Sequence, residues 1–192
     1  TKGLNRARQA GAKVSDDVLA KAEEWGKKNF DRKSGQFAPG GGDAGVPLYG
    51  ASNTVAAVQD GVNTNRQSQP AVQKIADDPS APKETRQKAQ KTLRRYAEAE
   101  ATLQDQTAAI ARQLDNQEFI AGFGSNGGEE FLSYLNISET LAAKEGKEWQ
   151  DWDRSMAENL ERIQDGDGGW SGHHCITGRT FCTAAALLVL LA

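Results

Sequence analysis

Residues 164–191 read QDGDGGWSGHHCITGRTFCTAAALLVLL and join a glycine-rich turn to a strongly apolar segment. The polar helix before this stretch is predicted to end at Gln164, and an apolar helix is predicted to begin near Thr177. The turn between them carries one large aromatic side chain, Trp170. Similar glycine–aromatic loops occur at 35–37 (GQF) and 122–124 (GFG). The order of parts therefore predicts a degenerate repeat of polar helix, glycine–aromatic loop and apolar helix.

Helical periodicity dominates the rest of the chain, and strand signals are nearly absent. Helices are predicted over 1–12, 15–30, 48–58, 83–114, 131–143 and 149–163, with loops at 31–46 and 119–128. The helix over 15–30 carries Val18, Ala22 and Trp25 on one face. Residues 63–82 are polar and hold or adjoin three of the five prolines, which predicts an irregular segment. The predicted fold is all-α and forms a single domain over 1–192, with a long polar helical insertion at 63–114.

Composition narrows the class of protein. The 192 residues suffice for one domain, 38% are hydrophobic, and the mean hydropathy is -0.65. A net charge of -3 gives no argument for a nucleic-acid partner, and none is expected. The basic residues between 83 and 95 indicate a solvated helix face. No apolar run is long enough to span a bilayer. The start at Thr1 and the apolar end suggest a fragment of a larger, bacterial protein, so no localisation is assigned.

The segment 164–170 (QDGDGGW) resembles the QW repeat of the squalene–hopene cyclases and their relatives. The protein prenyltransferase β subunits share the α/α toroid of that superfamily. The stretch 4–11, followed by a polar helix with Trp25, is also similar to these repeats. The resemblance implies an α/α-toroid segment of about three helix pairs, roughly half of a complete toroid.

The chemistry of that superfamily does not carry over to this sequence. The segment lacks an Asp-x-Asp-Asp acid, and Asp165 and Asp167 lie in the repeat loop. The zinc site of the prenyltransferases needs a histidine far from its cysteine, whereas His173 and His174 adjoin Cys175. The Cys-x-Glu-Gln motif of the thioester proteins is also absent. The resemblance thus implies a scaffold without its catalytic residues.

His173, His174 and Cys175 are the first candidate site. They could bind a metal with Cys182, or serve as nucleophile and base. Two helical turns, about 10 Å, would separate the cysteines if both were helical, so one zinc could not join them unless Cys175 precedes the helix. A disulfide between Cys175 and Cys182 is the other possibility, if the chain bends at Gly178. The favoured interpretation is capping histidines and a packed cysteine, with no metal and no cofactor.

Arg179 and Trp170 are the remaining candidates. An arginine at a helix N-terminus could bind an anion, but pairing with Asp165 or Asp167 is the favoured interpretation. The two aspartates lack the spacing of a calcium loop. Trp170 could line an apolar ligand cavity with Trp25, Trp149 and Trp152, but we expect core or seam packing.

The function expected from these observations is non-enzymatic: a terpenoid-cyclase-like repeat domain that acts as a binding or interaction module. The alternative is an isoprenoid cyclase or prenyltransferase relative whose catalytic residues lie outside this segment. The expected partner is an apolar, isoprenoid-like ligand or another protein domain. Self-association is expected as well, because half a toroid would expose its apolar inner layer.

Overall fold

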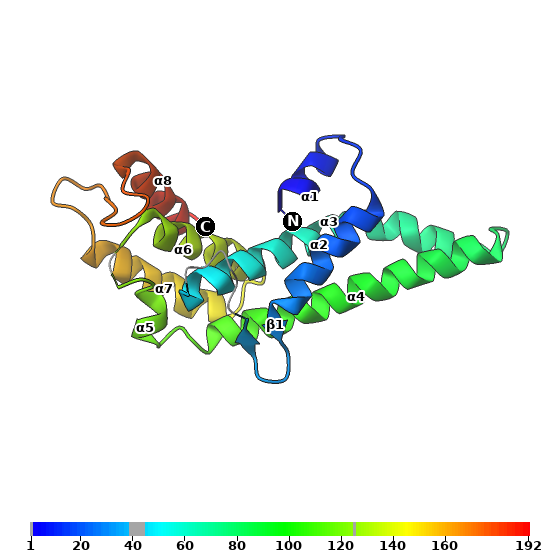
Figure 1. Cartoon of the computed structure of the whole chain (residues 1–192), viewed down its shortest axis with the longest axis horizontal. Helices are drawn as coiled ribbons and strands as arrows, with labels where there is room; N and C mark the ends of the chain where they lie inside the picture. Colours follow the sequence, from blue (N-terminus) through cyan, green and yellow to red (C-terminus); the bar gives the residue numbers. More distant parts are fainter. Residues whose placement is uncertain (1, 39–44, 125) are drawn as a thin grey trace. The chain divides into compact units, whose positions relative to one another are not determined.

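The structure is a computed structural model that describes residues 2–38, 45–124 and 126–192 (Figure 1). It confirms the all-α class, since the described residues form eight helices and one short antiparallel hairpin. The elements are α1 (Lys2–Gln9), α2 (Asp16–Lys28), β1 (Phe30–Asp31), β2 (Gln36–Phe37), α3 (Pro47–Asp77), α4 (Lys83–Ala111), α5 (Gln117–Ile120), α6 (Gly128–Ala142), α7 (Lys147–Arg162) and α8 (Arg179–Leu190). The toroid arrangement stays a prediction.

The chain divides into two compact units. The first comprises Thr1–Lys28 and Ala57–Asp105, and the second comprises Asn29–Ala56 and Gln106–Ala192. Most of the segment expected as an insertion, 63–114, thus belongs to a unit that also holds α1 and α2. The β1–β2 hairpin lies mostly within the loop predicted over 31–46 but begins at Phe30, which had been assigned to the preceding helix. Residues 39–44 of that loop lie outside the described residues.

In the first unit, α2 packs through a different face from the one that its periodicity suggests. Val18 and Trp25 are 43% and 54% exposed, whereas Leu19 and Gly26 are buried. A Cβ atom at Gly26 would lie only 3.0 Å from Val58 Cγ2. The missing side chain thus lets α3 approach closely, and the close approach outweighs the apolar stripe.

The prediction of an irregular segment over 63–82 is wrong, because α3 continues as a helix through Pro70 to Asp77. Proline lacks the N–H donor of a helix interior, so the helix needs support from tertiary contacts. The Arg66 guanidinium supplies one by bonding both carboxylate oxygens of Glu100 on α4, at 2.6 and 3.0 Å. The chain ends α3 and turns between 78 and 82, where Asp78 Oδ1 accepts from the Ser80 N–H at 2.8 Å.

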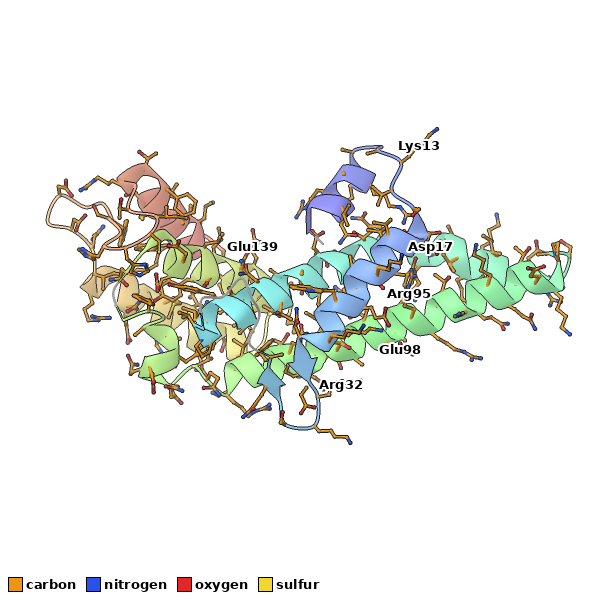
Figure 2. All side chains as sticks on the ribbon, in the orientation of Figure 1. Lys13, Asp17, Arg32, Arg95, Glu98 and Glu139 are labelled. Carbon is orange, nitrogen blue, oxygen red and sulfur yellow. The ribbon has the colours of Figure 1, made fainter. Side chains whose placement is uncertain are left out.

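Charged side chains also join α2 to α4. Figure 2 labels Arg95 and Glu98 on α4, which pair with Glu23 at 3.3 Å and with Lys27 at 3.0 Å respectively. These partners partly neutralise the charges of α4, whose composition had suggested a simple solvated face.

In the second unit, α6 is the central helix. It buries Phe131, Tyr134, Ile137 and Leu141, and both α7 and α8 pack on it. The Trp152 indole N–H of α7 donates to Ser138 Oγ at 2.8 Å. Ser52 near the start of α3 donates to Ser133 Oγ at 3.0 Å. No helix in the described part of the chain has both the length and the apolar character needed to cross a membrane.

The three glycine–aromatic loops differ in their surroundings. Phe37 packs against Phe30 across the hairpin, with tilted rings and 4.9 Å between ring centroids. Phe123 is 65% exposed. Trp170 is buried, and its indole N–H donates to the Leu160 carbonyl of α7 at 2.9 Å. The sequence repeat therefore does not correspond to three equivalent local structures.

Candidate metal centre

The loop before α8 lies against the first turn of α6. Gly127 and His174 form an isolated parallel bridge. The Gly128 N–H donates to the Ile176 carbonyl at 2.8 Å, and the His173 N–H donates to the Asn126 carbonyl at 2.5 Å. These main-chain bonds bring residues 173–176 next to Glu129, which is far from them in sequence.

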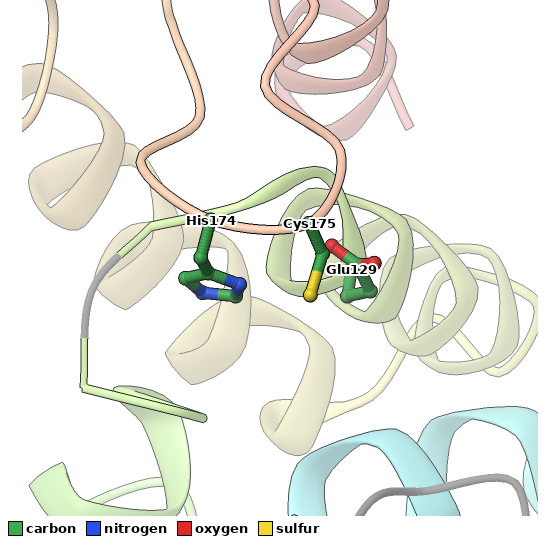
Figure 3. Close-up of side chains that lie close together, drawn as sticks. All are labelled: Glu129, His174 and Cys175. Carbon is green, nitrogen blue, oxygen red and sulfur yellow. The ribbon is translucent and has the colours of Figure 1, made fainter.

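Three side chains of different chemistry converge at this contact. One ligand atom each of Glu129, His174 and Cys175 lies within 4.8 Å of the other two. Figure 3 shows the three side chains on the same side of the loop. We call them the Glu–His–Cys cluster.

An unusual backbone conformation places the two neighbours together. Successive side chains of an extended chain point to opposite sides. Cys175 has φ +47°, in the left-handed region that non-glycine residues seldom occupy. This conformation turns the thiol toward the side of the His174 ring. Strained residues of this kind concentrate at functional sites.

A buried carboxylate behind the cluster holds His174. Glu130 is fully buried, and its Oε2 lies 3.2 Å from His174 Nε2. Oε2 also accepts from the Gly127 N–H at 2.9 Å, which ties the third residue of α6 back to its N-cap. Oε1 accepts from the Phe123 N–H at 2.9 Å and from the Tyr49 hydroxyl. Glu130 thus has four polar partners, which are two backbone N–H groups, the Tyr49 hydroxyl and the His174 ring.

The residues around Glu130 restrict both its hydrogen-bond partners and the space next to its carboxylate. Burial, reinforced by the hydrogen bond to Glu130, raises the pKa of Tyr49 well above its usual range, so the phenol stays a donor. At Gly122, with φ +60°, a Cβ atom would lie 2.4 Å from Glu130 Oε1. This position therefore requires glycine both for its backbone and for the space that the carboxylate fills.

The structure separates the residues that the sequence had grouped. His174 and Cys175 join the cluster, whereas His173 is exposed and is not part of it. Cys182 is buried inside α8, and its thiol lies 3.8 Å from the Ile176 carbonyl. Both cysteines are free thiols in the structure, and the disulfide stays a prediction. Cys175 does precede α8, which was the condition for one zinc to join the two cysteines, but Cys182 is not part of the cluster.

Arg179 and Trp170 lie outside the cluster. The Arg179 guanidinium lies 3.3 Å from Asp165 and also bonds Asp167, in line with the pairing favoured from the sequence. Trp170 contacts α8 as well as α7, since its main-chain N–H donates to Thr183 Oγ1 at 3.0 Å.

Sequence reasoning did not select Glu129, Glu130 or Tyr49. The pair Glu129–Glu130 follows two glycines and opens an apolar helix, where acidic residues ordinarily read as favourable partners of the helix dipole. Only the contact with the loop 173–176 gives them another role. Comparisons with known protein families, with curated proteins and with solved structures find no match for this chain.

Proposed function

We propose that this chain is a non-enzymatic binding module and that its second unit binds a soft divalent cation, with Zn²⁺ as the first candidate. The convergence of Glu129, His174 and Cys175 carries the proposal. Zinc takes thiolate, imidazole and carboxylate ligands, whereas Mg²⁺ and Ca²⁺ prefer oxygen ligands alone. Three protein ligands leave one position of a tetrahedral zinc for water or a further ligand.

A metal suits this cluster better than a free nucleophile does. The Glu129 carboxylate lies close to the Cys175 thiol, and both groups bind zinc in their anionic forms. A cation between the two groups would stabilise both charges at once.

The contact with Glu130 supports the same conclusion. Metal-bound histidines ordinarily donate their second ring N–H to a carboxylate, which fixes the ring and increases its basicity. His174 Nε2 has such a partner in Glu130. With that proton on Nε2, the coordinating atom is Nδ1.

Metal titration of the full chain tests the proposal. The metal-free protein, prepared with a chelator that is then removed, is titrated with Zn²⁺ by calorimetry and with Co²⁺ by absorption spectroscopy. A thiolate ligand gives Co²⁺ a charge-transfer band in the near ultraviolet. We expect one site, which Mg²⁺ does not fill, with the thiolate band present.

The chain offers a matched control for two of the three ligands. His174→Ala and Cys175→Ser should abolish tight binding, whereas His173→Ala and Cys182→Ser should leave it intact. Glu129→Gln should weaken binding, and Glu158→Gln on α7 should not. Unchanged zinc affinity in Cys175→Ser, or equal losses in His173→Ala and His174→Ala, would contradict the assignment.

The apolar surface of α8 supports a second role of the module, association with another copy of the chain. Leu187, Leu188 and Leu190 are 46%, 53% and 42% exposed, and Phe181 on the same helix is 40% exposed. Burial of such side chains at an interface is favourable. Sedimentation of wild type and of Leu188→Gln tests this role, with Val18→Gln in the first unit as the control. A wild-type monomer at all concentrations would refute it.

Only the sequence resemblance, at 164–170 and at 4–11, supports the alternative, an isoprenoid cyclase or prenyltransferase relative. Binding of geranylgeraniol to the intact chain, measured by native mass spectrometry, would favour this alternative.

A further inference from the structure

The second unit also contains a large half-open groove that none of the roles above uses. It has a volume of about 650 Å³, within the usual range of ligand sites. Segments of the β1–β2 hairpin, the start of α3, the end of α4 and the α5 region line it. We call it the hairpin groove.

The lining combines apolar walls with amide side chains. Phe37, Phe119, Phe123, Val46 and Pro47 supply the apolar surface, and Gln36, Gln113 and Asn116 supply the amides. Asn116 is already engaged, because its side-chain oxygen accepts from the first N–H groups of α5 and its nitrogen donates to Gln113. Gln36 is exposed, so its amide faces solvent. Such a surface suits a ligand with both apolar groups and hydrogen-bonding amides.

Charge narrows the class of ligand. Glu118 is exposed and is the one ionisable side chain among the described lining residues. An exposed aromatic ring, that of Phe123, lines the same groove. A carboxylate and an aromatic face together attract a Lys or Arg side chain. The Arg112 guanidinium packs against Gly35 and places a positive charge close to this lining. Because this charge would favour an acidic ligand, the test below also includes glutamate-containing peptides.

We infer that the hairpin groove binds an extended peptide segment that carries an apolar and a basic side chain. The peptide amides would bond the glutamine side chains, the apolar side chain would pack on the phenylalanine rings, and the basic side chain would approach Glu118. This role goes beyond the metal site and requires no bound metal, although Phe123 also lies 5.2 Å from the His174 ring.

A tetrapeptide array probed with the purified full chain tests the inference. The array contains tetrapeptides that pair Leu or Phe with Lys, Glu or Gln at each position. We expect retention of peptides with Leu or Phe beside Lys, both with and without a chelator. Glu118→Gln should weaken the best peptide on the order of threefold, the size of an exposed ion pair. Glu158→Gln removes the same charge from α7, which does not line the groove, and should change nothing.

NMR spectra of the labelled protein then locate the peptide. We expect the amide signals of Gln36, Gly122 and Phe123 to move on titration. No retained tetrapeptide, a preference for glutamate-containing peptides, equal responses of the two glutamate variants, or signal changes confined to α8 would each overturn the inference. A loss of peptide binding on chelation would also overturn the inference, because the inference requires no bound metal. If the protein binds peptide but not zinc, only the proposed metal site is refuted.

Discussion

Glu130→Gln is the substitution that tests the site most directly, because it keeps the side-chain shape and removes only the charge. Each carboxylate oxygen of Glu130 has two donors, and a glutamine must place an NH₂ group opposite one pair. If the NH₂ group faces Tyr49 and Phe123, the phenol can rotate to accept, and the Phe123 N–H loses its acceptor. If it faces His174 and Gly127, the ring can change tautomer, and the Gly127 N–H loses its acceptor.

The first arrangement leaves the partly buried N–H of Phe123 unsatisfied, and the second leaves the buried N–H of Gly127 unsatisfied. Both arrangements also convert charged hydrogen bonds to neutral ones. An unsatisfied buried donor costs about 1–3 kcal/mol, and a hydrogen bond to a charged group is worth about 1 kcal/mol more than a neutral one. The protein takes the cheaper arrangement, so we expect Glu130→Gln to lower the free energy of unfolding of the second unit by about 2 kcal/mol. Exposed Glu158→Gln should change it by no more than about 0.5 kcal/mol.

Urea unfolding followed by tryptophan fluorescence measures this difference. The Trp25→Phe background leaves Trp149, Trp152 and Trp170, which all lie in the second unit. The experiment is done in chelator, so that metal binding does not contribute. A Glu130→Gln midpoint equal to that of Glu158→Gln would refute the reasoning, because it would mean that the four donors do not depend on a charged acceptor.

Three further predictions concern the loop and its cysteines. Without metal, Cys175 should react with a thiol reagent much faster than Cys182, because Cys175 is exposed while burial raises the pKa of the Cys182 thiol; equal rates in the native protein would contradict this. Trp170→Phe removes the indole N–H and leaves the Leu160 carbonyl without its donor, which should cost about 1–3 kcal/mol in urea unfolding, more than Trp149→Phe costs. The hydrogen bond from Arg179 holds the pKa of Asp167 below its ordinary value of 3.8, so this pair stabilises the loop above that pH and is lost as the pH falls through the lowered value. The protection of the Gly169 amide, taken as its exchange rate relative to the intrinsic rate at the same pH, should fall over that acidic range in wild type, because its N–H donates to Asp167. Asp167→Asn should remove this change in protection.

The helices that the sequence predicts well are those in which an apolar stripe and a terminal signal agree. The helices over 131–143 and 149–163 correspond to α6 and α7, because Gly146 separates two strongly periodic segments. The polar half of α3 was not predicted, since its Asn, Gln and Ser residues have weak intrinsic preference and its support comes from α4. The two-residue strands of the hairpin are too short for a period-two pattern to be visible.

The candidate site could be predicted only in part, for a physical reason. His174 and Cys175 stood out as adjacent side chains with metal-binding chemistry. Their partner Glu129 comes from another helix, and nothing local in the sequence encodes the main-chain bridge at Gly127 that joins them. The placement of Cys175 beside His174 likewise depends on the positive φ of Cys175, a conformation that glycine, not cysteine, ordinarily signals.

The main-chain bridge between Gly127 and His174 has a consequence for how a metal would leave the protein. The ligands at 129 and 174 are about 45 residues apart, and closing a loop of that length through the metal alone would make folding depend on it. Here hydrogen bonds of the backbone already close that loop, at Gly128 and His173. The metal would therefore bind reversibly to a site that is already folded, and its loss would leave the fold around the site intact.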